Sequence, residues 1–141
     1  QLQWLERRLD EAEADDSVRA VFVALHHPAF TNRIREGESA WTREGVLSRM
    51  AARPKARLLL AGHVHSYEHF QIDGVHCVVS GGGGSPLHEL RDASDPEARP
   101  DLYRGPRSFH YLKIRAGDRI LVDVVMQRPD GTWFLADRWP L

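Results

Sequence analysis

The sequence predicts an α/β fold in which strands of a parallel β-sheet are connected through helices. Two short, continuous apolar runs, 20–25 and 58–61, have the composition of strands buried on both faces, which is typical of parallel sheets. A predicted helix at 41–52 lies between them, and strand–helix–strand is the unit that joins parallel strands by a right-handed crossover. A further amphipathic helix is predicted at the start of the chain from apolar residues at helical spacing: Leu2, Leu5, Leu9 and Ala12.

The second half of the chain has the pattern of antiparallel strands. Runs 69–72 and 75–79 flank Asp73-Gly74, a dipeptide that favours a two-residue hairpin turn. The polar stretch 88–106 is predicted to be an excursion over the surface. Turn residues then separate three more predicted strands: 109–114, 120–126 and 132–137. We find no internal repeat and no boundary, and we predict one domain over 1–141.

Composition excludes several classes of protein. The chain has 141 residues, of which 42% are hydrophobic and 28% charged, and its net charge is −1, so it lacks the basic excess of a nucleic-acid binder. No apolar run approaches the roughly 20 residues that a membrane-spanning helix needs. A single cysteine, Cys77, excludes an internal disulfide and a cysteine-rich zinc site. The sequence does not indicate a cellular compartment.

Histidines follow both of the apolar strands. His26 comes directly after Leu25, and His63 follows Ala61 and Gly62. Ligand sites in open α/β sheets form at the carboxyl ends of strands, so these imidazoles are predicted to converge if the strands are neighbours. On extended backbone, His63 and His65 would point to the same side. Three histidines are enough for a metal site with an open coordination position, although a surface or core role is the ordinary alternative for each.

Three motifs, in the same order, resemble a known family. The run 62–68 (GHVHSYE) resembles the GHxH signature of the calcineurin-like metallophosphoesterases, and its GHVHxYE form is similar to the purple acid phosphatase branch. The run 24–28 (ALHHP) resembles that family's histidine–proline motif, and 78–86 (VVSGGGGSP) its glycine-rich segment. The order and spacing of the motifs agree over nearly the whole chain.

The resemblance implies a function, a fold and a set of ligands. His26 and His63 would bind one metal ion and His65 a second, with His27 the rival of His26 for the first role. The two ions, iron, zinc or manganese, would activate a hydroxide that hydrolyses a phosphomonoester or phosphodiester substrate. The fold would be the carboxy-terminal half of a four-layer α/β/β/α sandwich, with the strands from Phe109 onward largely in the second sheet.

The family's earlier motifs do not occur in this sequence. No DxH, GD or GNH string precedes His26, and in the family these motifs supply the bridging carboxylate. Neutral imidazoles do not offset the repulsion between two divalent ions at close range, so an anionic bridge is needed. We therefore expect the chain to be a partial domain whose partner is a missing amino-terminal half of the same domain, and to be inactive without it.

Other residues and functions remain open. His27, His69 and Tyr67 are candidate substrate contacts, although His69 is more simply a cap of the first hairpin strand. Arg33 and Arg35 are candidates for substrate recognition or for a solvated loop. The four glycines 81–84 do not match a phosphate-binding loop and are expected to permit close backbone packing near the site. Two rival functions are a mononuclear, histidine-ligated zinc hydrolase and a non-catalytic, phosphoesterase-like binding module.

Overall fold

The computed structural model describes residues 1–35, 37–103 and 106–141. Helix α1 (Leu2–Ala14) is followed by strand β1 (Val21–Leu25), and a second helical segment lies further along the chain. That segment is a π-helix, η1 (Trp41–Leu47), continued by the short α-helix α2 (Ser48–Ala51). The later strands are β2 (Ala56–Ala61), β3 (Tyr67–Ile72), β4 (Val75–Ser80), β5 (His110–Ala116), β6 (Ile120–Gln127) and β7 (Trp133–Pro140). The predicted α/β class is confirmed.

Strands β1 to β4 form a mixed sheet in the order β1-β2-β4-β3. Strand β1 is parallel to β2 and β2 is parallel to β4, whereas β3 is antiparallel to β4 at the sheet edge. The register of β1 and β2 aligns Leu25 with Ala61. Because parallel strands end at the same side of a sheet, the segments that follow these two residues begin side by side.

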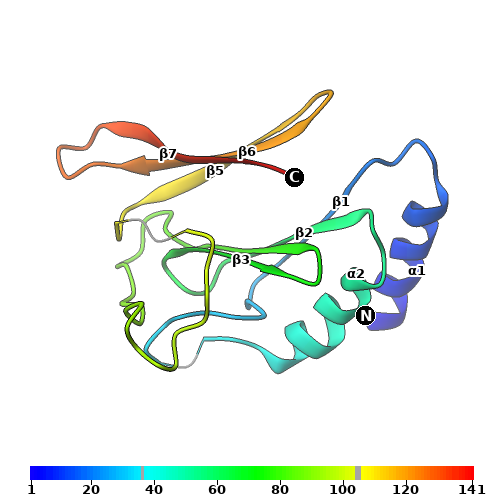
Figure 1. Ribbon diagram of the computed structural model, residues 1–141, viewed down its shortest axis with the longest axis horizontal. Coiled ribbons are helices and arrows are strands. Elements are labelled where there is room, and N and C mark those ends of the chain that lie inside the picture. Colours follow the sequence, from blue (N-terminus) through cyan, green and yellow to red (C-terminus); the bar gives the residue numbers. More distant parts are fainter. Residues whose placement is uncertain (36, 104–105) are drawn as a thin grey trace.

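Strands β5, β6 and β7 form a three-stranded antiparallel sheet in chain order. Figure 1 shows this sheet above the four-stranded one, with the helices on the opposite side of the four-stranded sheet. One apolar cluster lies between the helices and the four-stranded sheet, including Leu9, Met50 and Leu59. A second cluster lies between the two sheets, including Leu58, Val124 and Trp139. The layers are therefore helices, mixed sheet and antiparallel sheet.

The structure differs from the predicted elements at several boundaries. The predicted helix 41–52 is in place, but its first seven residues have π-helical hydrogen bonding, which an amphipathic pattern does not distinguish from α-helix. The first hairpin strand begins at Tyr67, two residues earlier than predicted, because β3 stays paired with β4 as far as Ser80. The predicted hairpin turn is confirmed, since Asp73 and Gly74 both have positive φ, 49° and 81°.

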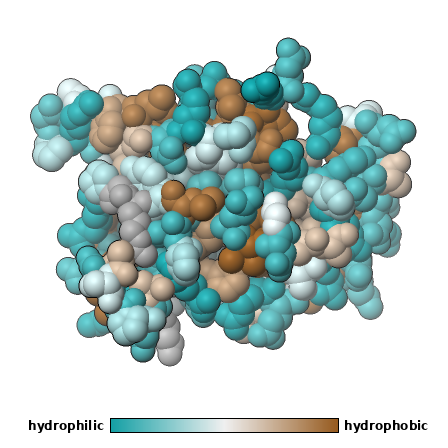
Figure 2. All heavy atoms as spheres, viewed as in Figure 1, coloured by the Kyte–Doolittle hydropathy of each residue, from teal (hydrophilic) through white to brown (hydrophobic). Residues whose placement is uncertain are grey.

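Several large apolar side chains of the three-stranded sheet remain exposed. Tyr111, Trp133 and Leu135 are each close to half exposed, and the Tyr111 and Trp133 rings lie 5.3 Å apart. Hydrophobic atoms reach the surface at the level of this sheet in Figure 2. In the described parts of the chain, no helix has both the length and the apolar character needed to cross a membrane.

Two histidines lie between the sheets, His69 buried and His76 half-buried. His69 is 2% exposed, and its Nε2 lies 2.8 Å from Nδ1 of His76. Both rings pack against Trp139 of β7, at centroid distances of 4.2 and 4.8 Å. Burial, followed by the charge of His76, lowers the pKa of His69 to about 4, and burial followed by Arg57 lowers that of His76. Both rings therefore fold in the neutral form.

This burial predicts that acid destabilises the fold. The pKa of His69 falls from 6.5 to about 4 on folding, so its stabilising contribution is present above pH 6.5 and is lost as the pH falls through about 4. The full loss for this group is about 3 kcal/mol in the free energy of unfolding. Urea denaturation at a series of pH values should show the decline, and His69→Phe should make it smaller. Equal pH dependence in the two proteins would contradict the assignment.

Candidate metal site

Three histidines meet where strands β1 and β2 end. His26 and His27 follow β1, and His63 follows β2. Nε2 of His26 lies 3.1 Å from Nδ1 of His63, and the ring centroids of His27 and His63 are 4.3 Å apart. One ring nitrogen from each residue lies within 4.8 Å of those of the other two. The backbone continues the strand pairing here, since Gly62 donates a hydrogen bond to the His26 carbonyl. We call these residues the three-histidine group.

The backbone of His63 is in the left-handed region. Its φ is 56°, a conformation that costs an L-amino acid about 1–2 kcal/mol. Short hydrogen bonds along the loop, from Val64 to the Gly62 carbonyl and from Ser66 to the Val64 carbonyl, hold this tight path. Strain of this kind persists where the surroundings determine it, and it is concentrated at functional sites. Here it turns the His63 ring toward His26 and His27.

The electrostatic surroundings keep His63 neutral. Burial is the largest influence that lowers its pKa, followed by the positive charges that His27, His26 and Arg33 can carry. A neutral imidazole has the free lone pair that metal ions bind.

The donor set fits one metal ion. Three imidazole nitrogens leave a position open on a tetrahedral zinc ion, and they also suit iron or manganese. Among the described residues, the three-histidine group includes no carboxylate. The group therefore has the ligands for one ion, and it lacks the anion that would join two ions at close range.

His65 lies outside the three-histidine group. Its ring stacks on that of His88, with centroids 4.2 Å apart and planes 13° apart, and its Nδ1 lies 2.9 Å from the Pro86 carbonyl. The expectation that His63 and His65 share one side of an extended backbone is wrong, because the positive φ of His63 breaks the two-residue alternation. His27 joins His26 in the group, so the two are not alternatives there. The assignment of His65 to a second ion remains a prediction.

The other predicted contacts lie in the layer between the sheets. His69 is buried against His76 and Trp139, within β3 and not at a strand cap as predicted. Tyr67 is 8% exposed, and its hydroxyl accepts a hydrogen bond from Nε1 of Trp139. Burial raises the pKa of Tyr67, so this hydroxyl stays protonated. Tyr67 also contributes to the wall of a pocket described below.

A buried carboxylate ties the two histidine loops together. Glu68 is fully buried. It accepts hydrogen bonds from the Thr31 hydroxyl (2.7 Å), the backbone N–H of Asn32 (2.5 Å) and the Ser66 hydroxyl (3.0 Å). Burial raises the pKa of Glu68, and these three donors oppose that rise. Thr31 and Asn32 belong to the loop after the first histidine motif, and Ser66 to the second. Sequence reasoning gave Glu68 no role, although a charged residue in an otherwise buried strand is a signal for one.

Two glycines allow close packing of the chain, and the first of them lies beside the second histidine loop. A Cβ on Gly81 would lie 2.1 Å from the Val64 carbonyl oxygen, and one on Gly82 would lie 2.2 Å from Nδ1 of His110. The Gly81 amide donates to the Ser66 carbonyl. The prediction that this segment packs its backbone near the site is confirmed at Gly81, whereas Gly82 packs against the His110 side chain of β5.

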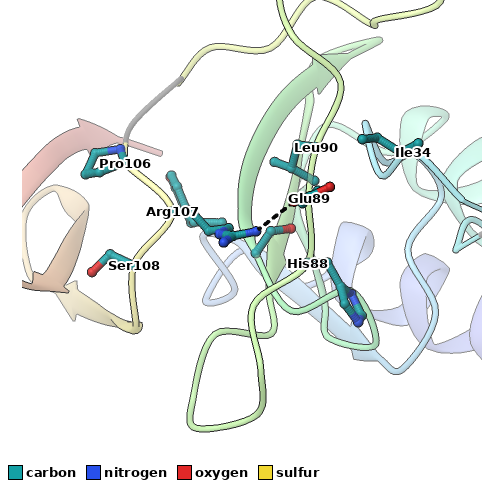
Figure 3. A pocket seen from close by; sticks show the side chains of 9 residues that line it. Ile34, His88, Glu89, Leu90, Pro106, Arg107 and Ser108 are labelled. Carbon is teal, nitrogen blue, oxygen red and sulfur yellow. Dashed lines mark ion pairs between the residues drawn. The ribbon is translucent and has the colours of Figure 1, made fainter.

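Two pockets adjoin these loops. Figure 3 shows one, of about 340 Å³, whose lining includes His88, Glu89 and Arg107, with Arg107 and Glu89 paired at 3.8 Å. The second, of about 410 Å³, is lined by Arg33 and Arg35 together with further charged side chains. The charge of Arg33 acts on both His63 and His88, where it contributes to a lowered pKa. Arg33 therefore adds positive potential beside the histidines.

The chain matches no protein-family model, and no curated protein matches it.

The tight packing at Gly81 predicts a large cost for a single methyl group. Gly81→Ala forces the Val64 carbonyl to move, and overpacking of this kind typically costs about 1–3 kcal/mol in the free energy of unfolding. Gly83→Ala is the matched control, because a Cβ there meets no atom within 4 Å and the φ is not positive. Thermal unfolding compares the two. Equal melting temperatures would contradict the account of this segment.

The buried carboxylate predicts a second difference in stability. Glu68→Ala leaves the hydroxyls of Thr31 and Ser66 and the Asn32 amide without their acceptor, which should lower the free energy of unfolding by about 3 kcal/mol. Glu89→Ala is the control, since it removes an exposed pair with Arg107 and should change stability by about 0.5 kcal/mol or less. Urea denaturation of both variants measures the difference, and a neutral Glu68→Ala would refute the role of Glu68.

Proposed function

We propose that the chain binds a metal ion through His26, His27 and His63, and that this site serves the hydrolysis of phosphate esters. The observation that carries the proposal is the convergence of three imidazoles from two strand ends, with His63 in a strained conformation. The motifs at 24–28, 62–68 and 78–86, which resemble those of the metallophosphoesterases, supply the reaction class.

The residues around the group are suited to a phosphate substrate. A bound metal ion would supply a hydroxide at neutral pH and stabilise charge on phosphate oxygens. His26, His27 and His63 would hold that ion, and Arg33 adds positive potential for an anionic substrate. The pocket beside His88 has the size to hold an organic group next to the phosphate. We propose this pocket as the place for the ester's alcohol portion.

The two-ion form of this function needs an anion that bridges the two ions. Within the described residues, the three-histidine group includes no such anion. We propose that carboxylates from further segments of the native polypeptide supply it, and that His65 binds the second ion. In this proposal the two facing sheets, with helices outside one of them, are the carboxy-terminal half of a four-layer sandwich.

A mononuclear zinc hydrolase is the second candidate. A specific observation favours it: the group is a complete three-nitrogen donor set in which no carboxylate takes part among the described residues. Such a set matches zinc sites that keep one position for water. The two candidates differ in the number of ions and in the role of His65.

Zinc titration of single-histidine variants tests the proposal. His63→Ala should weaken the first equivalent of Zn²⁺ about 100-fold or more, since even outer-shell changes cost about 10–100-fold. His65→Ala is the control for that ion and should leave its affinity within about twofold. Calorimetry on the 141-residue chain measures both. Unchanged zinc affinity in His63→Ala would refute the site.

The reaction and the number of ions need the complete native polypeptide. Metal-dependent release of nitrophenol from nitrophenyl phosphate, abolished by His63→Ala, would support phosphoesterase chemistry. Two bound ions, with the second lost in His65→Ala, would favour the two-ion form, and one bound ion would favour the mononuclear hydrolase. Zinc binding without hydrolysis of mono- or diesters would overturn the phosphoesterase proposal and leave a binding module.

A further inference from the structure

His88 and His65 are joined through both backbone and ring. The His65 amide donates to Nδ1 of His88 at 3.0 Å, and the His88 amide donates to the His65 carbonyl at 3.0 Å. Their rings stack at 4.2 Å, nearly parallel. Two residues before His88, the Pro86 carbonyl oxygen lies 2.9 Å from Nδ1 of His65. One short segment thus holds His65 by its main chain and by its ring.

These bonds determine which ring nitrogens carry protons. A carbonyl oxygen accepts and does not donate, so Nδ1 of His65 must carry the proton that it shares with Pro86. In the neutral ring, the lone pair of His65 is then on Nε2. For His88 the direction is reversed, because Nδ1 accepts from the His65 amide, which leaves Nε2 of His88 as an N–H donor.

We infer that His88 is a positioning residue, which anchors the Pro86 carbonyl beside His65 and so fixes His65 as the tautomer whose Nε2 can bind a metal ion. This inference rests on the proposed function, in which His65 receives the second ion. Histidine ligands in metal sites typically donate their other ring N–H to a carbonyl or carboxylate, which sets the tautomer and the ring orientation. Pro86 provides that carbonyl. The two hydrogen bonds between His65 and His88 hold the segment that carries Pro86 beside the His65 ring.

The position of His88 also connects the histidine loop to the neighbouring pocket. His88 lines the 340 Å³ pocket together with Glu89 and Arg107, and Figure 3 shows its side chain extending away from Arg107. His88 thus contacts His65, the proposed ligand, and also lines the proposed substrate space.

Two substitutions separate the hydrogen bond from the stack. His88→Phe keeps an aromatic ring to stack on His65 but removes the acceptor for its amide. His88→Asn loses the ring, yet its side-chain oxygen can accept the same bond. In ¹⁵N-labelled, metal-free chain, two-bond proton–nitrogen spectra distinguish protonated from unprotonated ring nitrogens. We expect an unprotonated Nε2 on His65 in the wild type and in His88→Asn, and a mixture of tautomers in His88→Phe.

Zinc binding by the complete native polypeptide gives the second readout. The second equivalent of Zn²⁺ should weaken about tenfold in His88→Phe and recover in His88→Asn, while the first stays within about twofold. Glu89→Gln, which changes the same pocket without contacting His65, is the control and should leave both affinities unchanged. Backbone amide spectra establish that each variant is folded.

The outcomes separate this inference from the proposed function. If His65 keeps one tautomer in His88→Phe, or if the second ion binds that variant as tightly as the wild type, the role of His88 is overturned. If the wild type binds one ion, the two-ion form of the function fails. The role of His65 as a metal ligand then fails as well. The tautomer comparison then decides whether His88 still orients that ring.

Discussion

Parallel pairing of β1 with β2 is the constraint on which the candidate site depends. The register that aligns Leu25 with Ala61 brings the segments after both strands to the same edge of the sheet, and the Gly62 amide extends the pairing to the His26 carbonyl. Imidazoles that are 37 residues apart in the chain thereby come within 3.1 Å of each other. Apolar packing against the helices on one face and the three-stranded sheet on the other holds this pairing in place.

The loops that carry the histidines are fixed by buried polar bonds and by close backbone packing. Glu68 joins both loops through three donors, and Gly81 lies where a side chain would meet the Val64 carbonyl. The strained backbone of His63 is held by hydrogen bonds of its loop, from Val64 to the Gly62 carbonyl and from Ser66 to the Val64 carbonyl. A site held in this way has its ligands arranged before an ion arrives, so less ordering is needed on binding.

Apolar runs and turn residues in the sequence were sufficient to predict the strands and the hairpin turn. The histidines that follow two of these strands predicted the convergence of His26 with His63. The positions that escaped prediction depend on backbone torsion and on distant partners. The left-handed torsion of His63 separates it from His65, and no turn dipeptide signals that torsion as Asp-Gly does at 73–74. His88 and Glu68 have no motif of their own, and their roles follow from contacts across 23 and 37 residues of chain. The place of His69 between the sheets likewise depends on Trp139, at the far end of the chain.

The most direct test of the account is the position of a bound ion. Crystals of the chain soaked in Zn²⁺, with anomalous diffraction recorded on both sides of the zinc absorption edge, would locate it without assuming its ligands. The account predicts an anomalous peak about 2.0–2.1 Å from ring nitrogens of His26, His27 and His63. A fully occupied zinc ion bound elsewhere, with these three rings left without metal, would contradict it.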